Sequence, residues 1–166
     1  MKLKRKQLIG IIILMVLPLF FLALSVDAQP LNYRAHLSGD EEVPDPVDTQ
    51  AQGQVKFQLS SDGTELYYRL IVANIENVMM AHIHMAFAGE NGPVIAWLYP
   101  SPTATMGELI PGRFDGVLVE GIITDEDVQF IEGGLEALIV RFDIEKAYVN
   151  VHTEQNPAGE IRGQIK

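Results

Sequence analysis

Four histidines are the residues of this chain with the clearest capacity for chemistry: His36, His82, His84 and His152. Two of them lie in the segment Ala81-His-Ile-His-Met85, and successive side chains of a β-strand point to opposite faces. In a strand, His82 and His84 therefore project together, with Cα atoms roughly 6.5–7 Å apart. Two imidazoles over this span can converge on one metal ion at about 2 Å per bond, with a third ligand supplied by another strand.

His152 is the natural candidate for that third ligand. In Tyr148-Val-Asn-Val-His152 the valines alternate with polar residues, so His152 lies opposite the aliphatic face, as His82 and His84 do. If the two strands are neighbours in one sheet, the three rings can meet on its outer face. Three nitrogen ligands suit copper or zinc, and copper is favoured here because the chain has no cysteine to supply thiolates. We therefore predict a metal site, with copper preferred, at His82, His84 and His152.

A metal-free alternative stays open, because exposed histidines are common on the outer faces of sheets. His36 lies on the polar face of the first expected strand, beside Arg34, and is expected to be a solvated surface residue rather than a ligand. Met80 shares the histidine face, and its thioether could favour Cu(I), although methionines more often fill gaps in a core. Glu154 and Glu160 could orient His152 by accepting a hydrogen bond from its ring.

The acidic stretch at residues 40–48 is a second place where ligand-type side chains gather. It carries Asp40, Glu41, Glu42, Asp45 and Asp48, which could bind calcium. The stretch lacks the alternating ligand register and the fixed glycine of an EF-hand loop. We therefore expect a solvated loop here rather than a calcium site.

Short strands are the elements that must position the histidines. Residues 31–37 alternate apolar and polar side chains, and Ser60-Ser-Asp-Gly63 separates two further strand-like runs as a hairpin turn would. The expected strands after the first cover residues 54–59, 65–73, 78–86, 94–99, 113–123, 147–153 and 160–165. Seven or eight short strands predict an all-β fold, an antiparallel Greek-key sandwich or barrel.

One stretch of the chain has a helical pattern. Thr124 precedes Asp-Glu-Asp127 in the manner of a capping box, and Val128, Ile131, Leu135 and Leu138 follow at helical spacing. We predict one or two short helices near residues 124–143, divided at Gly133-Gly134. Residues 138–144 could instead form a strand, because their apolar and polar side chains alternate. The chain carries no glycine-rich phosphate loop and no G-x-S-x-G motif.

The N-terminus has the three-part pattern of a secretory signal. Residues 1–7 are basic, residues 8–26 are largely apolar, and Val26-Asp27-Ala28 resembles a cleavage site. We predict a signal peptide at residues 1–28 and a single domain at residues 29–166, which would lie in the periplasm or outside the cell. The alternative is an uncleaved segment that tethers the domain to the membrane, since the apolar run is just long enough to span a bilayer.

Charge and cysteine content exclude several classes of function. The chain has a net charge of −10, and residues 29–166 contain 8 basic and 21 acidic side chains. Such a balance argues against nucleic acid and anionic membrane surfaces as partners. Without any cysteine, disulfides, thiolate zinc sites, iron–sulfur clusters and cysteine nucleophiles are also excluded.

At its histidine segments and in several others, the chain resembles the CHRD domain, a module named after its repeats in chordin and also found singly in bacterial exported proteins. The matching segments are Ala35–Pro44, Ala81-His-Ile-His84, Asn91-Gly-Pro-Val94, Tyr148-Val-Asn-Val-His-Thr153, Asn156-Pro and Gly159-Glu-Ile-Arg-Gly-Gln164. His36 departs from the family pattern, in which that position usually holds another residue. The resemblance implies an immunoglobulin-like or superoxide-dismutase-like β-barrel, and it implies no established activity.

Copper–zinc superoxide dismutases also have a His-x-His strand and a later Val-His segment that supply copper ligands. By this similarity the copper ligands would fall on His82, His84 and His152. The bridging histidine, the zinc loop and the structural disulfide of that family have no counterpart here. Residues 29–166, with 8 basic and 21 acidic side chains, carry a net charge of −13, which would repel an anionic substrate. Dismutase activity is therefore not expected.

These observations lead to three hypotheses of different classes. The first is an exported binding module that holds a metal ion through the three histidines and does not turn over a substrate. The second is a metal-free extracellular domain for adhesion or protein interaction, in which the histidines are structural. The third is a copper redox enzyme, which we expect least because no second catalytic group lies near the histidines in the sequence.

Overall fold

A computed structural model describes residues 31–100 and 109–166 of the chain. The predicted signal peptide, residues 1–28, lies outside the described residues. Within the described residues, no helix has the length and apolar character needed to cross a membrane. The strands are β1 (Asn32–Ser38), β2 (Gln52–Leu59), β3 (Leu66–His84), β4 (Val94–Tyr99), β5 (Ile110–Ile123), β6 (Tyr148–Thr153) and β7 (Ile161–Gln164). The helices are the short 3₁₀ turns η1 (Gly39–Glu41) and η2 (Asp125–Asp127), and α1 (Gly134–Asp143).

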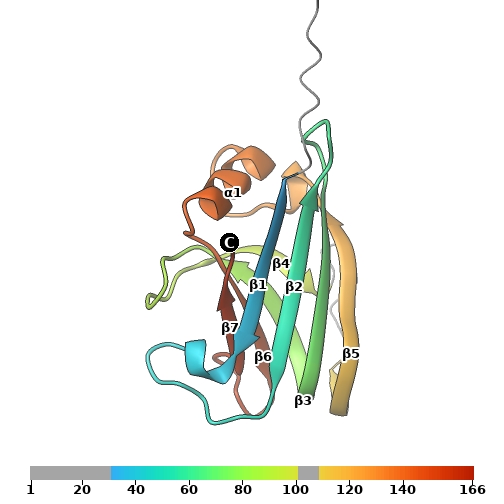
Figure 1. Cartoon of the computed structure of the whole chain (residues 1–166), viewed down its shortest axis with the longest axis vertical. Coiled ribbons are helices and arrows are strands. Elements are labelled where there is room, and N and C mark those ends of the chain that lie inside the picture. Colours follow the sequence, from blue (N-terminus) through green and yellow to red (C-terminus); the bar gives the residue numbers. More distant parts are fainter. Residues whose placement is uncertain (1–30, 101–108) are drawn as a thin grey trace, which may run out of the picture.

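All strand pairings are antiparallel and close the sheet on itself. The order is β2-β1-β7-β6-β3-β4, and an additional pairing between β2 and β3 completes a barrel. β4 and β5 pair with β3 as extra strands beside the closed part, and Figure 1 shows β5 along one flank of the molecule. The predicted all-β antiparallel barrel with a short helix is confirmed.

The barrel closes because β3 is long enough to take part in two pairings along each edge. Its first half pairs with β2 and β5, and its second half pairs with β6 and β4. The sequence pattern predicted two strands here, at residues 65–73 and 78–86, but β3 runs unbroken from Leu66 to His84. Asn74 and Asn77 adopt positive φ angles of 56° and 54°, which asparagine tolerates better than most residues, and the register shifts around them. These bulges redirect the strand without ending it.

The helical stretch differs from its sequence pattern at the start. The predicted capping box of Thr124 and Asp127 is present, but it closes only the 3₁₀ turn η2. The longer helix α1 begins at Gly134, where Asp125 Oδ1 accepts a hydrogen bond of 2.7 Å from the backbone N–H of Leu135. Residues 138–143 belong to α1, so the alternative that residues 138–144 form a strand is wrong.

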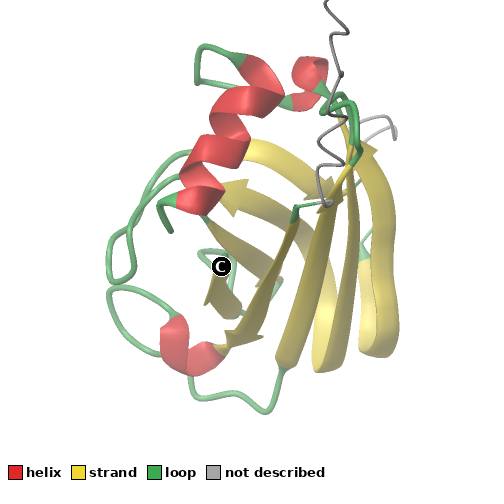
Figure 2. Ribbon diagram, turned by 45° about the horizontal axis from the view of Figure 1, so that its top comes forward, coloured by secondary structure: helices red, strands yellow, loops and turns green. Residues whose placement is uncertain are grey.

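The core fills the barrel and is covered at one end by α1 (Figure 2). The inward side chains of β1 are Tyr33, Ala35 and Leu37, as its alternation predicted. Phe142 of α1 packs with its ring centroid 5.1 Å from that of Tyr33 and 5.2 Å from that of Phe57. Burial of an aromatic or aliphatic side chain contributes about 1.5–3 kcal/mol, so α1 is held mainly by its apolar face.

Candidate metal centre

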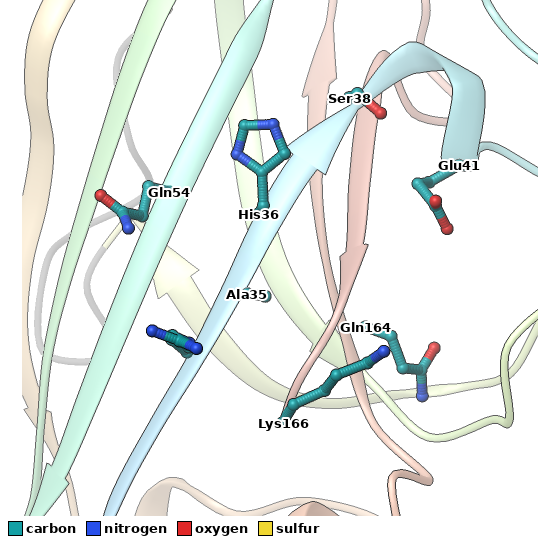
Figure 3. A pocket seen from close by; sticks show the side chains of 8 residues that line it. Ala35, His36, Ser38, Glu41, Gln54, Gln164 and Lys166 are labelled. Atoms are coloured by element: carbon teal, nitrogen blue, oxygen red, sulfur yellow. The ribbon is translucent and has the colours of Figure 1, made fainter.

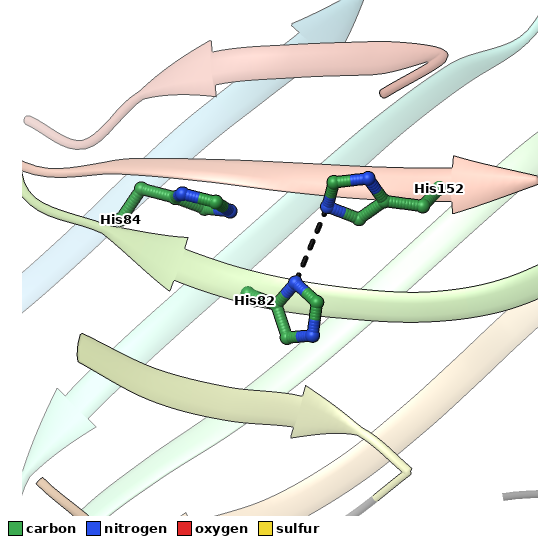
Figure 4. Close-up of side chains that lie close together, drawn as sticks. All are labelled: His82, His84 and His152. Carbon is green, nitrogen blue, oxygen red and sulfur yellow. Dashed lines mark hydrogen bonds between the residues drawn. The ribbon is translucent and has the colours of Figure 1, made fainter. Parts of the chain in front are cut away.

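The pairing of β3 with β6 brings together the two histidine segments that lie far apart in the sequence. In this antiparallel register His82 is opposite Asn150, and Met80 is opposite His152. Ala81, Ile83, Val149 and Val151 are buried in the hydrophobic core. Because strand side chains alternate, the three histidines lie on the other face of the same two strands (Figure 4).

The three rings converge closely enough for one ion. One nitrogen from each of His82, His84 and His152 lies within 4.8 Å of the others. His82 Nδ1 and His152 Nε2 lie 3.2 Å apart and form a hydrogen bond, drawn dashed in Figure 4. Two nitrogens bound to one tetrahedral ion at about 2.0–2.1 Å would lie roughly 3.3 Å apart, so this pair already has the spacing of two ligands on a shared ion.

Backbone carbonyls fix the orientation of two rings. The Nδ1–H of His84 donates to the carbonyl of Gly92 at 3.0 Å, and the Nδ1–H of His152 donates to that of Pro157 at 3.1 Å. A carbonyl oxygen only accepts, so Nδ1 carries the proton in both rings and Nε2 keeps its lone pair. Such an outer partner sets the tautomer that a metal ligand requires.

Neither acidic residue expected to orient His152 does so. Glu154 is exposed, and Glu160 accepts hydrogen bonds from Thr153 at 2.6 Å and Thr49 at 2.7 Å. The carbonyl of Pro157 takes the place that a carboxylate was expected to fill. Backbone partners of this kind leave no trace in residue types, which explains why the sequence pattern missed Gly92 and Pro157.

The site is buried, although the sequence pattern placed it on an outer face. His82, His84 and His152 are only 4%, 9% and 6% exposed, because the loops after β3 and after β6 fold over the sheet. Among the described residues, Nε2 of His82 and Nε2 of His84 are buried without a hydrogen-bond partner. Burying a polar atom without a hydrogen-bond partner lowers the folding stability by about 1–3 kcal/mol. These two nitrogens are therefore potential metal ligands that have no partner within the described residues.

Burial keeps the three imidazoles in the neutral form. It lowers the pKa of His82 to about 3, with smaller contributions from His152 and His84, and lowers the pKa of His152 to about 4. The pKa of His84 is also lowered, mainly by burial. Only the neutral imidazole offers a lone pair to a metal. Nε2 of His84 therefore has a free lone pair at neutral pH, whereas an ion would have to replace the hydrogen bond that His82 Nδ1 donates to His152 Nε2.

Aromatic side chains support two of the rings. Trp97 of β4 meets His82 edge to face at a centroid distance of 4.1 Å. Tyr148 stacks on His84 at 4.9 Å with an interplanar angle of 12°, and the guanidinium of Arg162 lies 3.5 Å from the centre of the Tyr148 ring. The alternation of Tyr148 with Asn150 and His152 could have revealed the contact between Tyr148 and His84. The contact between Trp97 and His82 depends on the register of β4 alone.

The remaining candidate ligands lie elsewhere or stay open. His36 is exposed on the outer face of β1, as expected, and does not belong to the histidine group. In residues 31–100 and 109–166 the acidic stretch at 40–48 contributes to no group of three ligands. Met80 is the register partner of His152, and its role as a ligand stays a prediction.

Comparison with known proteins places the chain in a family. The family model described as the CHRD domain matches residues 33–165, which covers β1 through β7 and all three histidines of the candidate centre. Neither the search of curated proteins nor that of solved structures finds a match. The family model spans well over half of the chain and nearly all of its described part, and the chain therefore belongs to the CHRD domain family.

Proposed function

We propose that this CHRD domain is an exported binding module that holds one metal ion, with copper preferred, through His82, His84 and His152, and does not turn over a substrate. The observation that carries the proposal is the convergence of three neutral imidazole nitrogens within 4.8 Å in a buried site. A structural role alone would not require two of the rings to keep unpaired buried nitrogens.

The donor set supports a borderline or soft divalent ion rather than calcium or magnesium, which prefer oxygen ligands. Among the ions that accept three imidazoles, copper binds more tightly than zinc at a given site. Export, predicted from residues 1–28, would place the domain where cytosolic thiols do not compete with the histidines for copper.

Storage or transport fits the geometry better than catalysis. The rings are at most 9% exposed, so a substrate would reach an ion here only after the covering loops move. A catalytic metal keeps an open coordination position that a substrate or water can enter. A site enclosed by Trp97, Tyr148 and the two loops instead favours retention of an ion.

A metal-free interaction domain is the second candidate, and one surface favours it. On the outer face of β3 and β5, Tyr67 is paired with Ile122 and Ile71 with Val117. These four apolar side chains are 38–44% exposed. The Arg69–Glu120 ion pair lies between the two apolar pairs on the same face. Exposed apolar side chains mixed with charged ones in this way occur at many protein interaction sites.

Copper titration of the full chain by calorimetry distinguishes the two candidates. We expect one copper ion per chain, bound more tightly than micromolar, as Cu(II) or Cu(I). The His82→Ala and His152→Ala variants should lose this binding, and His36→Ala, which changes an exposed histidine on β1, should keep it. Binding weaker than micromolar, or unchanged in the two site variants, would remove the metal proposal.

The single tryptophan of the chain provides a second readout in the same experiment. Because Trp97 contacts His82 directly, copper bound at this site should quench its fluorescence with the same stoichiometry as the measured heat. The interaction proposal instead predicts that a variant with all three histidines replaced by alanine still recognises its protein partner.

A further inference from the structure

Three basic side chains stand in a row across the outer face of the barrel, away from the histidine strands. Arg34 of β1 is the register partner of Lys56 of β2. On its other side, Arg34 exchanges two backbone hydrogen bonds of 2.9 Å with Lys166. Directly opposite residues have Cβ atoms about 4.5–5.5 Å apart on one face, so Lys56, Arg34 and Lys166 form a continuous cationic row.

None of these three cations forms an ion pair with a carboxylate of the described residues. The other basic side chains of the described residues all have partners. Arg69 and Arg113 pair with carboxylates, Lys146 lies over the ring of Phe87, Arg141 donates to a carbonyl and Arg162 is buried among acceptors.

Such a row opposes folding, since like charges directly opposite in a sheet repel each other. Residues 29–166 contain 21 acidic side chains, yet none that the structure describes pairs with these three cations. All three cations are exposed, so their charges are available to a molecule outside the protein. The arrangement is what an anion-binding surface requires.

The surface beside the row is hollowed. One hollow of about 480 Å³ is lined by Arg34 and Lys166 and by the polar side chains of His36, Gln54 and Gln164 (Figure 3). A second hollow of about 530 Å³ lies where Arg34, Lys56 and Lys166 meet Asn32. Arg34 and Lys166 therefore border both hollows and can reach an anionic group in either.

From this arrangement we propose that the face formed by Lys56, Arg34 and Lys166 binds a compact organic ligand that carries at least two carboxylate groups. Arginine can engage a carboxylate with two parallel hydrogen bonds, and the lysines add point charges on either side. The exposed amide of Gln54 is placed to hydrogen-bond the uncharged part of the ligand, whereas the amide of Gln164 donates to the carbonyls of Ala86 and Glu145 and only lines the hollow.

The acidic surroundings limit the size of that ligand. Glu41 lines the first hollow, and it belongs to the acidic stretch at residues 40–48. A long polyanion that followed the cationic row would run against these carboxylates. A small polycarboxylate fits within the row and avoids them, so compactness is part of the proposal.

Citrate, a compact tricarboxylate, is the probe for the test. The full chain, in a buffer depleted of metals on a chelating resin and at low salt, is titrated with citrate by calorimetry. We expect one citrate per chain. Arg34→Gln and Lys166→Gln should each weaken binding about tenfold or more, because each removes a charge-assisted hydrogen bond. Glu41→Gln should strengthen it.

Matched variants make each result decisive. Arg69→Gln changes a cation that already pairs with Glu120 at 3.0 Å and should leave citrate affinity unchanged. His82→Ala should also leave it unchanged, which separates this site from the metal proposal. Absence of citrate binding, equal weakening by Arg69→Gln, or tighter binding of inorganic phosphate or of a long polyglutamate than of citrate would overturn the proposal.

Discussion

Glu42 is a buried carboxyl group beside the polar face of β6, and its replacement by glutamine gives a sharp test of the polar interior. The side chain is 6% exposed, and its Oε2 accepts a hydrogen bond of 3.3 Å from Nδ2 of Asn150. Oε1 of Glu42 and Oδ1 of Asn150 are buried without partners among the described residues. Both face the same point beside Gly159, where an added Cβ would lie 2.7 Å from Oε1 and 2.6 Å from Oδ1.

A proton on Glu42 supplies the donor that these two acceptors lack. Burial raises the pKa of Glu42 to about 7, against smaller lowering effects of the Asn150 hydrogen bond and the Arg162 charge. In the unfolded chain the carboxyl ionises near pH 4.5. Between these two values the folded state holds a proton that the unfolded state releases, so stability falls as pH rises and the full penalty is present above pH 7.

The Glu42→Gln variant should remove this penalty, because the amide has both a donor and an acceptor at all pH values. A pKa raised from 4.5 to about 7 corresponds to roughly 3 kcal/mol at about 1.36 kcal/mol per pKa unit. Solvent screening around the loop reduces this value. At pH 8 we therefore expect the variant to be about 1–3 kcal/mol more stable than the parent. Below pH 4.5 the two should be equally stable.

Urea denaturation across this pH range measures the effect directly. The control is Glu41→Gln, which changes the exposed neighbouring carboxyl and should not alter the dependence of stability on pH. A Glu42→Gln variant that is less stable than the parent at pH 8 would refute the reasoning. It would mean that the ionised carboxylate, paired electrostatically with Arg162, is the stabilising form.

Two glycine substitutions near the histidines give further tests. In Gly92→Ala the new Cβ would lie 1.9 Å from the carbonyl oxygen of Met85, so the loop must shift. The shift would move the Gly92 carbonyl that holds His84. We therefore expect a lower melting temperature and weaker quenching of Trp97 by copper. In Gly159→Ala, a φ angle of +140° and a Cβ 2.4 Å from Asn150 Nδ2 combine backbone strain with a clash. We expect a loss of about 2 kcal/mol or more in urea denaturation, and an unchanged midpoint would show that the loop adapts freely.

Local patterns were sufficient for most strands and for the direction of the histidines. Alternation predicted the inward face of β1, and the Asp62-Gly63 turn was correctly placed, with Gly63 at a φ angle of +76°. The continuity of β3 was not predictable in this way, because Asn74 and Asn77 look like loop residues and only their bulged conformation shows that the strand continues. The capping box at Thr124 is real, but a cap does not fix how long the helix after it will be.

The sequence pattern could identify which histidines form the candidate centre, but not how deeply they are buried or which backbone groups hold them. That His82 and His84 share a face follows from the period of a strand, whereas their meeting with His152 depends on a pairing between segments 70 residues apart. The depth of the site depends on loops whose backbone carbonyls, at Gly92 and Pro157, hold the rings. Such contacts depend on the path of the chain and are invisible to residue-type patterns.

X-ray absorption spectroscopy of the copper-loaded full chain tests the central proposal most directly, because it reports the ligands of the ion itself. The proposal predicts three imidazole nitrogens at about 2 Å, and the loss of this signature in His152→Ala. A spectrum dominated by oxygen ligands, or one that His152→Ala leaves unchanged, would contradict it.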